Sequence, residues 1–298
     1  MQDVRDDKVA FLGLGLIAGS LAAALKEADW RGELLAWGPR ATSLERGREL
    51  GFVDWFSLDL QEVVSKADIV VISAPPLATA NLLPDVIALA IKASKPIITD
   101  IASIKGLIVD AAIPPYSRFV PGHPIAGSEH SGVDFAQPNL FSGREVILTP
   151  LDYTELDAIR KVETMWEIAG SRITHMTVSE HDETLAASSH IPHMLAYALT
   201  AMLAEDDLAP MNHGGGALRD MTRIAGSDPL MWRDIALANQ MAILKAMDNF
   251  SEHFGSLRQI IAEMDSDALD RFFAECRSTR RNHDQILNPI MRSSGEKS

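Results

Sequence analysis

Two short segments contain histidines whose chemistry could transfer a proton. His123 lies in PGHPIAGSEHSG at 121–132, a glycine- and proline-rich segment, and His190 and His193 lie in SHIPH at 189–193. A neutral imidazole can accept a proton near pH 7, which makes His123 a candidate general base. A histidine in a loop is more often a hydrogen-bonded structural residue, so the residue types by themselves leave both roles open.

A glycine-rich turn near the N-terminus could bind the phosphates of a dinucleotide. In GLGLIAG at 13–19, Gly13 allows a tight turn, Gly15 lets a pyrophosphate approach the backbone, and Ala18 is small enough for close helix–strand packing. The turn follows an apolar strand and opens a helix, which is the context expected of a dinucleotide site rather than of a mere packing turn. The predicted cofactor-binding residues are Gly13, Gly15, Leu16, Ile17, Ala18, Arg40 and Ser73.

The end of the second predicted strand bears on the choice of cofactor. A site for NAD usually places Asp or Glu there to bind the ribose 2′-hydroxyl. This chain has Trp37-Gly38-Pro39-Arg40 instead, without an acid. Because Arg40 could meet a 2′-phosphate, the sequence favours NADP and leaves NAD open; a solvated loop cation is the alternative interpretation of Arg40.

The elements that must position these residues alternate between short apolar strands and helices, which predicts a mostly parallel sheet with helices on both faces. The predicted strands are Val9–Leu12, Leu34–Trp37, 68–73, 96–99, 118–120, 147–148 and 172–176, and early helices are predicted at 20–27, 42–50 and 59–66. From His181 onward the pattern is almost entirely helical.

The predicted fold class is therefore α/β, with two domains. Residues 1–176 form a Rossmann-like, doubly wound dinucleotide-binding domain, and residues 177–298 form an all-α domain for substrate binding and dimerisation. The helices of the second domain are long and apolar, with little chain left to bury them, which predicts a homodimer formed through them.

Composition excludes several classes of protein. A net charge of −14 argues against a nucleic-acid surface. The most apolar stretch, at 9–25, is short and interrupted by glycines, so no membrane segment is expected. The lone Cys276 cannot form an internal disulfide, and MQDVRDDKVAFLG lacks a basic segment before its apolar run, which together predict a cytoplasmic protein.

Five segments resemble, in the same order, successive motifs of the prephenate and arogenate (cyclohexadienyl) dehydrogenases of tyrosine biosynthesis. They cover about residues 9–250 and are GLGLIAGSLA at 13–22, DIASIKG at 100–106, PGHPIAGSEHSG at 121–132, SHIPH at 189–193 and ALRDMTRIAGSDPLMWRDI at 217–235. The chain departs from the family at Ala18, where glycine is frequent, and near Gly38, where the acid is missing. The resemblance implies an NAD(P)-dependent oxidoreductase that converts prephenate to 4-hydroxyphenylpyruvate, arogenate to tyrosine, or both.

The resemblance also implies roles for two residues in the reaction. The substrates carry a hydroxyl at ring carbon C4, a carboxylate at C1 and a side chain that ends in a second carboxylate. Hydride leaves C4, the hydroxyl loses its proton, and loss of CO2 makes the ring aromatic. By this similarity His123 is the catalytic histidine, and Ser103 orients it or touches the substrate.

The substrate contacts implied by the resemblance come from the two later motifs. SHIPH supplies His190 and His193, with His193 as the main contact, and Arg223 holds a substrate carboxylate. The planar fork of an arginine suits both oxygens of a carboxylate. Trp232, in the same motif as Arg223, lines the pocket.

Other interpretations of these residues stay open at this point. His190 and His193 have the spacing of two metal ligands on one helix face, with His181 or Asp182 as further ligands. We favour substrate binding and expect no metal.

Two further functions also have to be weighed. Lys245-x-x-x-Asn249 mimics a signature of the β-hydroxyacid dehydrogenases, although it falls late in the chain and within an amphipathic helix. A non-catalytic dinucleotide-binding sensor could use the same fold, because a fold does not fix a function. Both stay as alternatives to the dehydrogenase of tyrosine biosynthesis.

Overall fold

A computed structural model describes residues 3–127, 130–205 and 207–287. The chain separates into two compact units, Met1–Ile243 and Leu244–Ser298. Residues 128 and 129, within the predicted histidine segment, lie outside the described residues.

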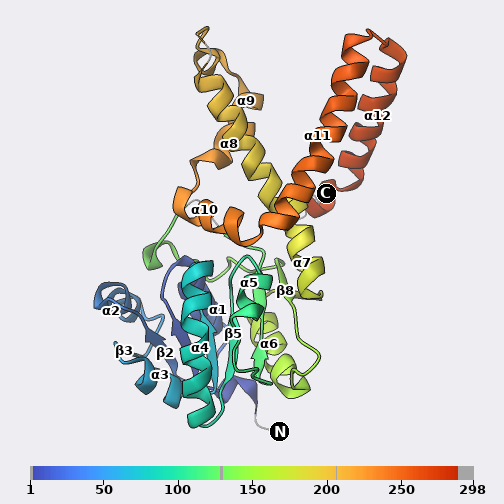
Figure 1. Cartoon of the computed structure of the whole chain (residues 1–298). Helices are drawn as coiled ribbons and strands as arrows, with labels where there is room; N and C mark the ends of the chain where they lie inside the picture. The colour runs from blue at the N-terminus through green and yellow to red at the C-terminus, as the bar shows by residue number, and fades with distance from the viewer. Residues whose placement is uncertain (1–2, 128–129, 206, 288–298) are drawn as a thin grey trace, which may run out of the picture. The chain divides into compact units, whose positions relative to one another are not determined.

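The first unit is built on a six-stranded sheet in which all neighbouring strands are parallel (Figure 1). Its order is β3-β2-β1-β4-β5-β6. The strands are β1 (Val9–Leu12), β2 (Leu34–Trp37), β3 (Trp55–Ser57), β4 (Ile69–Ile72), β5 (Ile97–Asp100) and β6 (Phe119–Val120). The order reverses between β1 and β4, which is where a doubly wound sheet binds its ligand. The predicted Rossmann-like architecture is confirmed.

Both faces of this sheet are buried, which explains its continuous apolar strands. In β1, Val9 and Phe11 point into one core, and Ala10 and Leu12 point into the other. The first core is covered by α1 (Leu16–Glu27) and α6 (Leu156–Ile168). The second is covered by α3 (Leu60–Lys66), α4 (Pro76–Lys92) and α5 (Gly106–Asp110), and α2 (Ala41–Glu49) lies between β2 and β3 in sequence.

A second sheet, β7-β8-β9, carries the first candidate histidine. Strand β7 (Gly122–Pro124) pairs antiparallel with β8 (Glu145–Leu148), and β8 pairs parallel with β9 (Arg172–His175). His123 is therefore a strand residue, opposite Ile147, and its assignment to a loop was wrong. Pairing with β8 keeps this segment extended, and a glycine- and proline-rich sequence gives no sign of that pairing.

After His175 every described element is helical. A capping box between Thr177 and Glu180 starts α7 (Val178–Leu185), which continues through a π-helical turn (Ala186–His190) into α8 (Ile191–Ala204). Short helices follow: α9 (Gly216–Thr222), the 3-10 turn Arg223–Gly226 and α10 (Pro229–Ala238). The contact grouping keeps residues up to Ile243 in the first unit, so the boundary at 176/177 stays a prediction based on the change from mixed to all-helical structure.

The remaining helices are α11 (Gln240–Ala262), α12 (Ser266–Asn282) and α13 (Asp284–Leu287). Large apolar side chains on them stand in solvent, including Phe254 at 60% and Phe273 at 53% exposure. Within the part of the chain that the structure describes, none of the helices combines the length and the apolar character needed to cross a membrane.

Candidate active site

The glycine turn between β1 and α1 is shaped by close backbone contacts. Gly13 has a φ of +97°, and a Cβ there would lie 2.3 Å from the carbonyl oxygen of Ser73, at the end of β4. The Gly13 N–H donates to the carbonyl oxygen of Trp37 at 2.8 Å, which ties the turn to β2. Only glycine fits this position, as the tight-turn role predicted.

Gly15 stands at the N-terminus of α1 with open space in front of it. It is the N-cap of the helix, with no side-chain cap, and a Cβ built on it would meet nothing within 4 Å. Unpaired N–H groups at a helix N-terminus favour an anion, so this open turn fits the phosphates of a dinucleotide. Ala18 is fully buried in the core beneath.

Gly19, the next residue of α1 after Ala18, is also closely packed. A Cβ on Gly19 would lie 2.9 Å from the Cβ of Ala136 and 3.1 Å from Cγ2 of Val133. The segment around Ala136 is also held by the N–H of Gln137, which donates to Oγ of Ser20. The sequence pattern did not single out Gly19, because it could not show this crossing segment.

Arg40 occupies the position predicted for cofactor choice. It is exposed, follows β2 and is the N-cap of α2. Among the described residues its guanidinium makes no hydrogen bond or ion pair. Ser73 is half-buried at the end of β4, where its N–H donates to the carbonyl oxygen of Leu12. Ser73 thus follows β4, one of the two strands that flank the reversal of strand order, and Arg40 follows β2, which pairs with the other flanking strand, β1.

His123 is linked to a buried histidine and through it to a carboxylate. Nδ1 of His123 lies 2.9 Å from Nε2 of His181, and Nδ1 of His181 lies 2.7 Å from Oδ1 of Asp182. His181 is fully buried, whereas His123 keeps partial exposure. A carboxylate only accepts hydrogen bonds, so Nδ1 of His181 carries a proton and donates it to Asp182. With a single ring proton, His181 then presents the lone pair of Nε2 to His123.

A buried ion pair fixes the strand that carries His123. Lys105 and Asp100, both 0% exposed, are bonded to each other. Nζ of Lys105 also donates to the carbonyl oxygen of Gly122 at 2.6 Å, and the Gly122 N–H donates to Oδ1 of Asp100 at 3.2 Å. The pair therefore joins β5 to β7 at the residue before His123.

Ser103, in the same DIASIK segment, is half-buried. Within the described part of the chain its hydroxyl makes no hydrogen bond, and Nδ1 of His123 is bonded to His181 instead. The structure thus leaves the Ser103 hydroxyl available to a bound molecule.

His190 is held behind the site. It is 1% exposed, and its Nδ1 lies 3.2 Å from Nδ2 of Asn239, which also donates to the carbonyl oxygen of Asp182 at 2.9 Å. Because an amide nitrogen donates, Nδ1 of His190 is the acceptor and its proton lies on Nε2. Its ring meets Trp232 edge-on, with centroids 6.1 Å apart.

His193 lies one helical turn beyond the π-helix and is partly exposed. Its Nδ1 donates to the carbonyl oxygen of Ser189 at 2.9 Å, which leaves Nε2 as an acceptor. Its ring stacks on Trp232 with centroids 3.7 Å apart. The Trp232 side chain is buried, and its indole Nε1 has no hydrogen-bond partner among the described residues.

Arg223 begins the turn after α9 and is exposed. No hydrogen bond or ion pair engages its guanidinium in the described residues. Its charge lies close enough to His193 to lower the pKa of that imidazole. An unpaired guanidinium beside a neutral histidine is suited to bind a carboxylate.

The three histidines are neutral near pH 7. Burial lowers the pKa of His123 well below its ordinary value, and the nearby charges of His181, Lys105 and His190 act in the same direction. Burial lowers the pKa of His190 to about 4. Burial also lowers the pKa of His193, against the hydrogen bond to Ser189, which raises it. His190 thus interacts electrostatically with both His123 and His193, and we refer to these three residues as the histidine cluster.

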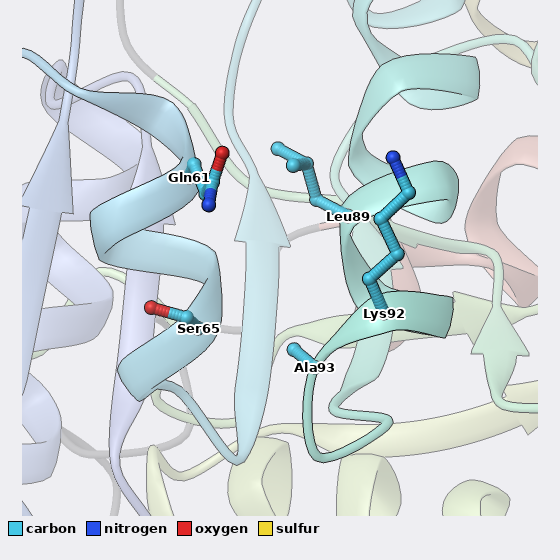
Figure 2. A pocket seen from close by; sticks show the side chains of 5 residues that line it. All are labelled: Gln61, Ser65, Leu89, Lys92 and Ala93. Atoms are coloured by element: carbon cyan, nitrogen blue, oxygen red, sulfur yellow. The ribbon is translucent and has the colours of Figure 1, made fainter.

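The described residues contain no group of three or more His, Cys, Asp or Glu side chains arranged to hold a metal. Both ring nitrogens of His181 are already bonded, one to His123 and one to Asp182. A separate small hollow lies between α3 and α4, lined by Gln61, Ser65, Leu89, Lys92 and Ala93 (Figure 2). It shares no residue with the histidine cluster or the glycine turn.

The sequence patterns did not assign a role in the reaction to Asp100, Lys105, His181, Asp182 or Asn239. Asp100 and Lys105 lie within the DIASIKG motif, and His181-Asp182 lies in the polar segment SEHDET at 179–184, shortly before SHIPH. These positions are a signal that could have drawn attention to them. Their partners lie far away in sequence, so the bonds themselves could not be read from it.

The described residues thus include an open glycine turn at a helix N-terminus, a neutral histidine on β7 and a guanidinium with no partner among them. Residues 21–175 match the family model described as prephenate dehydrogenase, nucleotide-binding domain, and residues 177–275 match prephenate dehydrogenase, dimerization domain. The cyclohexadienyl dehydrogenase of Zymomonas mobilis is 35% identical over 278 residues, which cover 91% of this chain and 94% of that protein.

Solved structures agree with the sequence comparison. A prephenate dehydrogenase from Aquifex aeolicus in complex with hydroxyphenyl propionate and NAD+ is similar with a TM-score of 0.88 and 31% identity, covering 93% of this chain and 98% of that chain. The arogenate dehydrogenase of Synechocystis is similar with a TM-score of 0.80 and 30% identity, covering 93% and 99%. The resemblance carried by the five motifs is confirmed: the chain belongs to the prephenate dehydrogenase family.

Proposed function

We propose that this protein is an NAD(P)-dependent dehydrogenase that oxidatively decarboxylates prephenate, arogenate or both. The relatives with solved structures include a prephenate and an arogenate dehydrogenase. The observation that carries the proposal is the position of His123: its Nδ1 is bonded to His181, and its Nε2 is left for the substrate. A neutral base on a partly exposed strand is what removal of the substrate hydroxyl proton requires.

The chain's residues divide the proton chemistry from the redox chemistry. When bound, the nicotinamide ring accepts the hydride that leaves C4 of the substrate. Nε2 of His123 accepts the proton of the C4 hydroxyl as the carbonyl forms, and loss of CO2 from C1 completes the aromatic ring. Burial lowers the pKa of His123, which keeps its imidazole neutral at pH 7, the form that can accept a proton. A positioned general base contributes about 10²–10⁴-fold to rate.

Arg223 and His193 bind the substrate in this proposal. The guanidinium of Arg223 holds a carboxylate, and Nε2 of His193 accepts a hydrogen bond. His190 was predicted as a further contact, but its 1% exposure suits a supporting role instead, holding Trp232 from behind. Ser103, with its unbonded hydroxyl, contacts the substrate or the cofactor near His123.

The cofactor is a nicotinamide dinucleotide held by Gly13, Gly15, Leu16, Ile17, Ala18 and Ser73. We propose that NADP is preferred, because exposed Arg40 at the N-terminus of α2 can meet a 2′-phosphate and no acid follows β2. The Aquifex aeolicus relative was solved with NAD+. A more than tenfold higher kcat/KM with NAD than with NADP would overturn this preference.

Residues 1–176 are proposed as the dinucleotide-binding domain and 177–298 as the helical domain for substrate binding and homodimerisation. The match of 177–275 to a dimerization-domain family and the exposed apolar side chains of α11 and α12 support the homodimer. A cytoplasmic location is supported by the free, exposed thiol of Cys276, which persists most readily in a reducing compartment.

The test is steady-state formation of reduced cofactor, crossing prephenate and arogenate against NAD and NADP. Turnover in any of the four combinations supports the proposal and ranks substrate and cofactor together. No turnover by a folded protein that still binds cofactor would overturn it and favour a non-catalytic sensor. Turnover of a 3-hydroxy acid instead would favour the β-hydroxyacid class.

A further inference from the structure

The buried pair His181 and Asp182 lies directly behind the proposed base. His181 is 0% exposed, so it cannot meet substrate itself. Its two ring nitrogens join His123 to Asp182 at 2.9 and 2.7 Å. From the sequence, His181 and Asp182 were considered only as metal ligands. In the structure both side chains form hydrogen bonds.

Asp182 is fixed as an acceptor by the start of α5. Its Oδ1 accepts from the N–H of Lys105 and its Oδ2 from the N–H of Gly106, both at 2.8 Å. A Cβ on Gly106 would lie 3.0 Å from Oδ2, so a larger residue there would push against the carboxylate. Burial raises the pKa of Asp182, but the bonds from His181, Lys105 and Gly106 lower it overall, so the carboxylate is ionised.

If both imidazole rings are neutral, the hydrogen bonds that join Asp182, His181 and His123 have only one possible assignment of donors and acceptors. The carboxylate takes a proton from Nδ1 of His181, and Nε2 of His181 therefore accepts from Nδ1–H of His123. The remaining nitrogen of His123, Nε2, is left unprotonated.

We infer that Asp182, acting through His181, is a positioning residue that fixes the His123 tautomer with its basic lone pair on Nε2. The inference rests on the proposed function for its catalytic consequence. No proton needs to move along the chain: the substrate proton ends on Nε2 of His123, and the ionised Asp182 stabilises the imidazolium that forms. The other charged or titratable groups that face His123 are Lys105, from the segment before α5, and His190, from the π-helix.

The direct test measures the tautomer of His123 by nitrogen-15 NMR of the imidazole groups, in the full-length protein and without substrate. In the wild-type protein, His123 is expected to carry a proton on Nδ1 and none on Nε2. In Asp182→Asn, the amide N–H can donate to Nδ1 of His181, which reverses the chain and places the His123 proton on Nε2. A wild-type His123 protonated on Nε2, or an unchanged tautomer in the folded variant, would overturn the inference.

The kinetic arm uses the same variant. Asp182→Asn is expected to lower kcat by about 10²-fold or more, because Nε2 of His123 is then protonated and cannot accept the substrate proton. KM should change little, because the substrate contacts remain. Asp7→Asn is the matched control, because Asp7 is a buried carboxylate paired with Lys161 and is not part of this chain. If Asp182→Asn keeps kcat within threefold, the inference fails.

The two arms separate the possible failures. A wild-type protein that oxidises neither prephenate nor arogenate overturns the proposed function, and the NMR result still decides the tautomer. If Asp182→Asn does not fold, His181→Gln replaces it. That variant interrupts the hydrogen bonds between Asp182 and His123 but keeps the Asp182 carboxylate. It is expected to leave His123 as a mixture of tautomers. A single Nδ1–H tautomer in His181→Gln would overturn the inference.

Discussion

His193 and Trp232 stack face to face, with ring centroids 3.7 Å apart and an interplanar angle of 23°. The stack joins α8 to α10 and fixes the His193 ring beside the free guanidinium of Arg223. His190 meets the same indole edge-on, so Trp232 packs against both histidines of the SHIPH motif. The indole thus couples the orientation of the partly exposed imidazole of His193 to that of the buried imidazole of His190.

Replacement of His123 by Asn should remove the base and spare the cofactor site. We expect turnover to fall by at least about 10²-fold, because an amide cannot accept the hydroxyl proton as an imidazole does. The dissociation constant of the cofactor, measured by fluorescence titration, should stay nearly unchanged. The control is His253→Asn, since His253 lies on α11 and is exposed. Unchanged turnover in His123→Asn would remove this residue from the mechanism.

Replacement of Arg223 by Gln should act on binding rather than on proton transfer. A charged hydrogen bond contributes about 1.5–3 kcal/mol, so KM for the substrate should rise about 10–100-fold. Arg219→Gln is the matched control, because its guanidinium lies on the same segment and is already paired with Asp220. An Arg223→Gln variant with the wild-type KM would show that another group holds the carboxylate.

The fold was largely predictable because most of its strands have a recognisable local sequence pattern. In β1 and β4 every residue is apolar and buried, which a parallel sheet covered on both faces demands. The strands that escaped prediction, β3 and β7, are short, and β7 reads Gly-His-Pro. Their conformation comes from pairing with distant strands, so it has no local signature.

The site was predictable where a motif carries its own chemistry and not where bonds cross the chain. The glycine turn was predicted from its own pattern, and the roles of His123, His193 and Arg223 were predicted from motifs that resemble those of a family. The π-helical turn was not, although it sets the register of His190: the N–H of Ile191 donates to the carbonyl oxygen of Ala186. That extra residue in the turn depends on packing, as do the bonds that Asn239 makes.

Two alanine substitutions in the glycine turn should separate folding from cofactor binding. Gly13→Ala places a Cβ 2.3 Å from the Ser73 carbonyl oxygen at a φ of +97°, so its melting temperature should fall clearly. Gly15→Ala meets nothing within 4 Å, so its melting temperature should stay near that of the wild type.

The added methyl group at position 15 nevertheless occupies the space in front of α1. The dissociation constant of the dinucleotide should therefore rise about tenfold or more, whereas substrate contacts stay intact. Calorimetric titration of cofactor and a thermal melt of each variant give both readouts. Wild-type cofactor affinity in Gly15→Ala would show that the phosphates bind elsewhere.

The buried His190 should make the protein less stable in mild acid. Its pKa is about 4 in the folded protein, whereas an unfolded histidine titrates near 6.5. Between these values the unfolded state binds a proton that the folded state does not, so stability is lost as the pH falls through this window. At pH 5 the loss from this single group amounts to about 2 kcal/mol, and it is small at pH 7.

Replacement of His190 by Gln removes that titration while an amide oxygen can still accept from Asn239. The variant is expected to be less stable than the wild type at pH 7, because it packs less well against Trp232. The difference in unfolding free energy between the two proteins should shrink by about 2 kcal/mol at pH 5, since only the wild type carries the His190 penalty. Urea unfolding at both pH values measures this, with His253→Gln as the control. Equal pH dependence in the wild type and His190→Gln would show that His190 is protonated in the folded protein, and the bond from Asn239 to its Nδ1 would then have to be reassigned.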